Sequence, residues 1–293
     1  MGIDSLVQYD AASAAPHRTE MARFAVGAGP SGVAVERGAN RAVVWSQFAR
    51  TVSIVDLTRA AEASGAVTRA TLPAAERSAA AEKLARGREL FHASDARISD
   101  DGRACASCHP DGRDDSLTWS TPTGPRQTPM LAGRLARTAP FGWNGDGESV
   151  NQHLEHTFQR LGGRGLPGEE LEALIAYASE VASPRRNAPT DDKLAEQGKA
   201  LFHSEAAGCA GCHIGGAETD RAAHDVGSKV KADAVPGFDT PSLRFVGGTA
   251  PYFHDGRYST LRALLGDSSA QMGHTQHLDA RELAALEAYL RTL

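Results

Sequence analysis

The pattern Cys-x-x-Cys-His occurs twice in this chain of 293 residues, at 105–109 and at 209–213, and the two copies use all 4 cysteines. This pattern is the attachment signature of haem c. The two thiols lie one helical turn apart and bond to the vinyl groups of a porphyrin, and the adjacent histidine reaches the iron. We therefore expect two covalently attached haem c groups, held by Cys105, Cys108 and His109 and by Cys209, Cys212 and His213.

Other uses of paired cysteines fit the sequence less well. A thioredoxin-like site needs a Cys-x-x-Cys beside a βαβ pattern, and neither copy has that context. A four-cysteine zinc site would leave both histidines as a coincidence, and a disulfide framework is unusual in a chain this long. Haem attachment is the interpretation that uses every residue of both motifs.

Charge and hydropathy narrow the classes of function. The net charge of -5 carries no nucleic-acid signature, and no segment approaches the roughly 20 apolar residues needed to span a membrane. Because haem c is attached outside the cytoplasmic membrane, we expect an exported protein that is periplasmic or otherwise extracytoplasmic, as on the cell surface. Residues 1–5 lack the features of a signal peptide. We expect that a signal sequence has been removed or that the chain is part of a longer protein.

Residues 1–60 carry short β-branched runs separated by turns, at 32–35, 41–45 and 51–57. These runs predict antiparallel strands. With a preceding strand at 6–10, they resemble one blade of a β-propeller of the type found in bacterial surface proteins. A propeller needs several blades, so this interpretation implies missing upstream blades. A small β extension packed on the haem domains is the alternative, and both stay open.

The remaining chain contains the same layout twice. A helical segment at 84–92 precedes the first haem motif, and a similar segment at 194–203 precedes the second. Helical composition begins at Pro73, which suits a helix start, and amphipathic closing helices are predicted at 169–177 and 281–290. We therefore predict a mainly α fold: two cytochrome c-like helical haem domains in tandem, 73–186 and 187–293, preceded by the short antiparallel β segment.

Residues 80–293 resemble the bacterial dihaem cytochrome c peroxidase superfamily, which includes the MauG-type enzymes that oxidise protein side chains. The resemblance rests on Thr-Pro-Ser-Leu-Arg-Phe-Val at 240–246 with Thr-Ala-Pro-Tyr-Phe-His-Asp-Gly at 249–256, and on the segments 124–131 and 141–145. It implies that one haem binds peroxide while the other passes electrons to it, and that axial ligands decide which is which. His109 and His213 would be the proximal iron ligands.

The resemblance also implies a sixth ligand for the second haem. Met272 precedes the closing helix, where the peroxidases place an axial methionine, and a thioether raises the potential of a haem and closes the site. A core-filling methionine is the alternative, and His274 and His277 compete for the ligand role. MauG-type proteins carry a tyrosine in that position, but residues 259–288 contain none, which favours methionine here.

For the first haem, the family places a Gln and a Glu over the open iron face as acid-base partners. Matched on Trp143-Asn144-Gly145, this chain has Phe141 and Asn151 at those positions. The candidate catalytic residues are therefore Asn151 itself and its neighbours Glu148, Gln152, His153, Glu155 and His156. His153 and His156 are three apart on a predicted helix, so we expect both to face the same way, as acid-base groups or as a sixth ligand. Two solvated histidines are the alternative.

The resemblance implies three further candidate residues: Trp119, Arg126 and Arg244. Trp119 lies near where the family has an indole between its haems, which can relay an electron hole; core packing is the alternative. Arg126 and Arg244 are candidates for pairing with haem propionates, because a guanidinium fork matches a carboxylate.

A calcium ion is implied at the backbone carbonyls of Thr249 and Pro251, since calcium prefers oxygen ligands. The family's asparagine ligand has no clear match, and Asp114 or Asp115 could replace it. The expected partners are a small electron-donor protein, either a cytochrome c or a cupredoxin, and hydrogen peroxide as substrate. A homodimer is an open option.

Three functions remain open on the sequence. The first is a peroxidase that reduces hydrogen peroxide at the His109 haem with electrons relayed by the His213 haem. The second is MauG-like oxidation of a protein or organic substrate. The third is a non-catalytic electron-transfer cytochrome whose irons are both six-coordinate.

Overall fold

The computed structural model describes residues 2–267 and 271–293. The chain divides into two compact units, Met1–Cys105 with Leu161–Leu174 and Ala106–Arg160 with Ile175–Leu293. The boundary falls inside the first haem motif. The predicted division into haem domains at 186/187 stays a prediction, because compactness is a different criterion from internal repetition.

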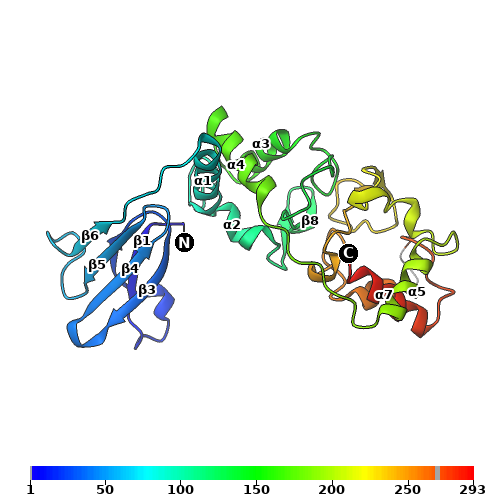
Figure 1. Cartoon of the computed structure of the whole chain (residues 1–293), viewed down its shortest axis with the longest axis horizontal. Coiled ribbons are helices and arrows are strands. Elements are labelled where there is room, and N and C mark those ends of the chain that lie inside the picture. The colour runs from blue at the N-terminus through cyan, green and yellow to red at the C-terminus, as the bar shows by residue number, and fades with distance from the viewer. Residues whose placement is uncertain (1, 268–270) are drawn as a thin grey trace. The chain divides into compact units, whose positions relative to one another are not determined.

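The first unit contains a four-stranded antiparallel sheet in the order β3-β4-β5-β6, formed by Pro30–Glu36, Arg41–Ser46, Thr51–Asp56 and Val67–Thr71 (Figure 1). A hairpin of β1 (Ser5–Tyr9) and β2 (Glu20–Ala25) supplies Phe24 to the same core. Side chains alternate across the sheet: Val44 and Val55 are buried in this core, whereas Val43 and Ile54 are exposed on the other face. The predicted runs at 32–35, 41–45 and 51–57 are confirmed as strands.

The sequence patterns do not predict β2 or β6. Their sequences, Glu-Met-Ala-Arg-Phe-Ala and Val-Thr-Arg-Ala-Thr, contain few β-branched apolar residues, and their pairing with β1 and β5 holds them in the sheets. With β6 included, the sheet has the four strands of a propeller blade.

Helix α1 spans Ala79–His92 and begins later than expected. The prediction of a start at Pro73 is wrong: residues 72–78 form no helix, and the Ser78 hydroxyl accepts a hydrogen bond from the Ala81 amide at 3.3 Å. Such an N-cap satisfies an amide that a helix start leaves unpaired. Helix α4 (Gly168–Glu180) lies beside α1, and Lys83 pairs with Glu172 at 2.7 Å.

The second unit contains the short helix α2 (Cys105–Cys108) from its second residue on, the hairpin β7–β8 (Thr118–Thr121, Gly124–Gln127) and helix α3 (Val150–Arg160). Further along are α5 (Asp192–Phe202), the two-residue strands β9 (Ala223–His224) and β10 (Phe238–Asp239), α6 (Leu261–Leu265) and α7 (Ala280–Leu290). The helices predicted before each motif and at the end of each half are confirmed as α1, α4, α5 and α7. The described residues thus combine seven α-helices with small antiparallel sheets, a more mixed content than the expected mainly α fold.

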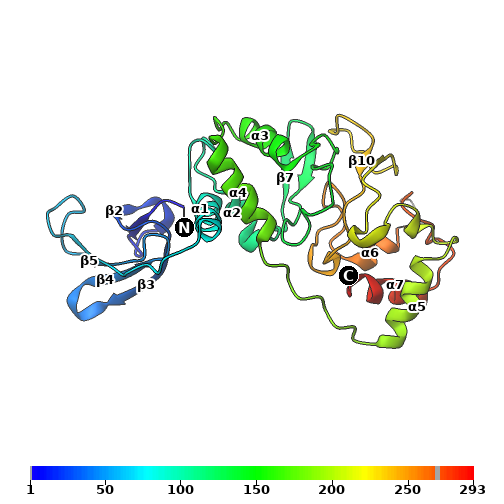
Figure 2. The same ribbon diagram turned by 45° about the horizontal axis from the view of Figure 1, so that its top comes forward.

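Helices α5 and α7 pack closely in the second unit (Figure 2). Their core contains Phe202, Leu261, Leu286 and Leu290. Gly198 lies at the closest approach, where a Cβ would be 1.8 Å from the Ala285 carbonyl oxygen. Asp279 and Glu282 form a capping box at the start of α7, which fixes where the chain enters this helix after the loop that carries Met272.

Candidate functional site: a haem cavity in the second unit

The second motif lines a cavity of about 340 Å³ that is formed entirely by residues of the second unit. Cys209, Cys212, His213 and Met272 all line it, and most of its remaining lining is apolar. Met272 is 59 positions from His213 in the sequence, and the structure brings both residues to the same cavity. His274 and His277 are exposed and do not line the cavity.

The orientation and the protonation state of the His213 ring suit a metal ligand. Its Nδ1 lies 3.2 Å from the Glu218 carbonyl oxygen, which orients the ring, and burial lowers the pKa of the imidazole. A neutral imidazole held through one nitrogen leaves the other for a metal. The loop of Met272 passes close to this motif, because a Cβ on Gly273 would be 3.5 Å from the Cys209 sulfur.

Three buried polar atoms that line the cavity have no hydrogen-bond partner among the described residues: Gln127 Nε2, Arg134 Nη2 and Asp239 Oδ1. Buried polar groups normally find partners, so these atoms indicate that the cavity is built for a polar-edged occupant. Two of them are donors suited to carboxylates. A largely apolar cavity with thiols, an imidazole and carboxylate-binding donors fits a haem, which is a flat apolar ring with two propionates.

Arg134 is a functional candidate that the sequence did not single out. Its Nε donates to the Arg244 carbonyl at 2.5 Å, and burial lowers its pKa to about 10, so it stays charged at neutral pH. Nothing in the sequence separates this arginine from the chain's other arginines. Arg134 is a candidate for binding an anion because it is buried with an unpaired donor, and the spacing of residues in the sequence does not show this burial.

The first motif forms α2 and ends at His109, whose Nδ1 lies 3.3 Å from the Arg113 carbonyl oxygen. Burial lowers the pKa of His109 to about 4, and the charge of nearby His153 acts in the same direction. His153 extends from α3 into the cavity, with its ring 6.4 Å from that of Phe141. Burial also lowers the pKa of His153, which favours a neutral imidazole.

The other candidates on α3 lie outside the cavity lining. Asn151 and Glu155 are exposed and bonded to each other, with Nδ2 3.0 Å from Oε1. His156 is also exposed. His153 and His156 are about 60° apart around the helix axis, and of the two only His153 lines the cavity.

Trp119 and Arg126 both form side-chain interactions with other residues of the protein. Trp119 Nε1 donates to Asp115 Oδ2 at 2.9 Å, and neither residue lines the cavity. Arg126 pairs with the buried carboxylate of Asp233 at 2.6 Å. Asp233 in turn lies 2.9 Å from His254 Nε2, so the three form a buried charged network beside the cavity.

Arg244 lies in the segment that carried the resemblance. Its guanidinium donates to the carbonyls of Gly216 and Gly133 and lies 3.5 Å from Glu218 Oε2. Thr249 and Pro251 both line the cavity. Their role as calcium ligands stays a prediction, and so does the role of the two arginines toward propionates.

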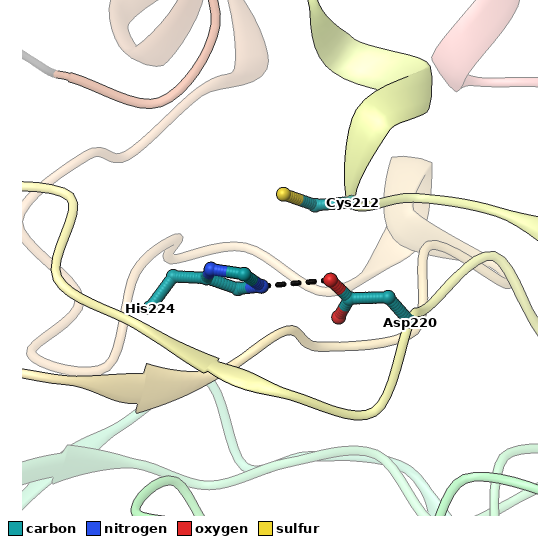
Figure 3. A group of neighbouring side chains, drawn as sticks. All are labelled: Cys212, Asp220 and His224. Carbon is teal, nitrogen blue, oxygen red and sulfur yellow. Dashed lines mark hydrogen bonds and ion pairs between the residues drawn. The ribbon is translucent and has the colours of Figure 1, made fainter.

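Cys212, Asp220 and His224 form a group whose ligand atoms all lie within 4.8 Å of one another (Figure 3). The ring of His224 points at Asp220, with Nε2 2.7 Å from Oδ2, and the Cys212 sulfur lies beside this pair. Because the Cys212 sulfur belongs to a haem-attachment motif, this pair lies beside the point where the haem would be attached.

The chain is similar to known haem proteins over most of its length. The cytochrome c family model matches residues 195–293. Methylamine utilization protein MauG of Methylorubrum extorquens is 30% identical over 72% of this chain and 78% of that protein.

Solved structures show the same fold. A chain of hydrazine synthase from Kuenenia stuttgartiensis is 25% identical, with a TM-score of 0.61 over 79% of this chain and 97% of that chain. The diheme peroxidase BthA from Burkholderia thailandensis is 16% identical, with a TM-score of 0.54 over 72% of this chain and 86% of that chain. In the part of the chain that the structure describes, helices long and apolar enough to cross a membrane are absent.

The two attachment motifs, the cavity shared by His213 and Met272, and the identity with MauG over more than two thirds of both chains lead to one family. The chain belongs to the superfamily of dihaem cytochrome c peroxidases and MauG proteins and is a c-type haem protein with redox function.

Proposed function

We propose that the protein is a dihaem peroxidase that reduces hydrogen peroxide. It would bind two covalent haem c groups in two tandem cytochrome c-like domains, and bound haem iron supplies one-electron redox chemistry. His109 would hold the haem iron that supplies the chemistry of peroxide reduction. His213 and Met272 would hold the haem iron that supplies electron transfer from a small donor protein, a cytochrome c or a cupredoxin.

The position of His153 carries this proposal. Among the acid-base candidates on α3, His153 lines the cavity and lies close enough to His109 to affect the pKa of that imidazole, although His109 itself is not among the lining residues. Burial keeps His153 neutral, so it can accept a proton from peroxide and return it to the departing hydroxide. Peroxide, two electrons and two protons then give two water molecules.

Other residues of the cavity have binding roles in this proposal. Gln127 and Arg134 donate to haem propionates, because both present unpaired buried donors. Thr249 and Pro251 hold a calcium ion through their carbonyls. Because haem c is attached outside the cytoplasm, the protein acts in the periplasm or at the cell surface.

Oxidation of a protein or organic substrate is the second candidate function. The identity of 30% with MauG favours it, whereas the presence of Met272 in the cavity, with no tyrosine at 259–288, favours peroxide reduction.

Rapid mixing of the half-reduced holoprotein with peroxide tests the proposal. We expect a high-spin haem that reacts with peroxide and binds cyanide. His153→Gln should slow peroxide consumption by roughly 10²–10⁴-fold, the usual contribution of an acid-base group, at unchanged haem content. His156→Gln, an exposed histidine on the same helix, is the matched control and should leave the rate unchanged.

Two results would contradict the proposal. Two low-spin haems that are inert to peroxide and cyanide in every redox state would identify an electron-transfer cytochrome. A His153→Gln variant that turns a low-spin haem into a high-spin, peroxide-reactive one would show that His153 is a sixth ligand and not an acid-base group.

A further inference from the structure

Asp239 is a buried residue, and one of its two carboxyl oxygens has no hydrogen-bond partner in the part of the chain that the structure describes. It is 9% exposed and lines the cavity, and the oxygen without a partner is Oδ1. Its backbone is fixed from two sides: the amide donates to the Trp143 carbonyl at 2.9 Å, and β10 pairs Asp239 with Ala223 of β9. These two backbone interactions fix Asp239 at the cavity wall.

An unpaired carboxyl at such a position is costly unless it is neutral or receives a partner. Burial, reinforced by the charge of Asp220, raises the pKa of Asp239 to about 7, and His224 opposes this shift. Arg126 stacks 5.3 Å over the neighbouring Phe238 ring, but its charge is paired with Asp233.

The strand pairing also relates Asp239 to the second haem motif. Phe238 pairs with His224, and His224 is bonded to Asp220 beside the Cys212 sulfur. Asp239 and Cys212 line the same cavity. The unpaired oxygen of Asp239 therefore lies at the wall of the cavity that would hold the haem attached at Cys212.

We propose that Asp239, as a neutral acid, donates a hydrogen bond to a propionate of the haem attached at Cys209 and Cys212 and shares its proton with that propionate. Reduction of this haem is therefore accompanied by the uptake of a proton. The inference rests on the haem binding in the proposed function. Two carboxyl groups that share one site cannot both ionise easily, so they hold a proton between them. An electron from the donor protein makes the haem more negative, which strengthens proton binding, and the proton comes from solvent. By reciprocity, losing the proton disfavours reduction.

The midpoint potential of the His213 haem, measured on the holoprotein between pH 5 and 9, tests this proposal. In the wild type, the potential should fall with rising pH, approaching about 59 mV per pH unit for one proton per electron. Asp239→Asn keeps the size and the hydrogen-bonding capacity but has no proton to lose, so its potential should be independent of pH. Glu205→Gln, an exposed carboxylate in the same unit, is the control and should keep the wild-type slope.

A pH slope that persists in Asp239→Asn would overturn the proposal, and a slope lost only in His224→Gln would assign the proton to the pair beside Cys212. If Asp239→Asn lacks haem, the infrared difference spectrum of reduced minus oxidised wild type decides. We expect a protonated-carboxyl band that shifts with aspartate isotope labelling, and no such band would refute the assignment. Neither readout depends on peroxide, so failure of the peroxidase proposal would remain distinguishable.

Discussion

At the residue scale, Arg126, Asp233 and His254 form a buried network in which the Asp233 carboxylate contacts both partners. The side chain of Asp233 has no exposed surface. Burial alone would raise its pKa, but hydrogen bonds from the Val230 amide, Arg126 and His254 hold the pKa below its usual range.

Asp233→Asn should destabilise the protein by about 3–5 kcal/mol, because removing one partner of a buried ion pair leaves the other charge uncompensated. Urea unfolding followed by haem absorbance measures this loss. Arg291→Met removes an exposed partner of Glu287 on α7 and should cost below about 0.5 kcal/mol. Equal losses in the two variants would refute the special role of Asp233.

The same network predicts a pH dependence of stability. Because the native pKa of Asp233 is lowered, its contribution is complete above the ordinary aspartate value of about 3.9 and is lost as the pH falls through the native value. The difference in unfolding free energy between wild type and Asp233→Asn should be constant from pH 6 to 8 and shrink below about pH 4. A difference that grows in acid would contradict this sign.

At the element scale, the contact of α5 with α7 depends on Gly198. An alanine Cβ would be 1.8 Å from the Ala285 carbonyl oxygen and 2.9 Å from the Tyr289 Cβ. Gly198→Ala should force the helices apart and cost about 1–3 kcal/mol or more, as overpacking does. Gly216→Ala, whose added Cβ would meet nothing within 4 Å, should leave the free energy of unfolding within about 0.5 kcal/mol of wild type. A neutral Gly198→Ala would show that the helices can shift without loss.

Elements with strong periodicity or fixed spacing were predictable from the sequence, and elements defined by their partners were not. Helices α5 and α7 carry apolar residues at helical spacing, and the haem motifs are visible because the chemistry fixes their spacing. Strand β6 is held by its pairing with β5, and α1 begins at its Ser78 cap rather than at Pro73. Asp239 and Arg134 gain their importance only from burial, and the sequence does not record burial one residue at a time.

At the scale of the whole molecule, the two units have separate cores. One core contains Phe24, Val44 and Val55, and the other contains Phe202, Leu286 and Leu290. No residue belongs to both clusters. Each core therefore stabilises its own unit, and a substitution in one core should lower the stability of that unit.

Val55 and Leu286 are both fully buried, at 0% exposure, and provide a matched pair of variants. Val55→Ala should cost about 2 kcal/mol from the lost apolar burial and speed amide exchange in β3–β6, with the haem absorbance midpoint in urea unchanged. Leu286→Ala should cost about 2–5 kcal/mol and lower that midpoint, with exchange in β3–β6 unchanged. Hydrogen exchange in β3–β6 reports on the first unit, and haem absorbance reports mainly on the second unit, which contains the whole second haem motif and the first motif except Cys105. If either variant moved both readouts, the units would unfold as one cooperative body, because local stabilities report independently only when the units open independently.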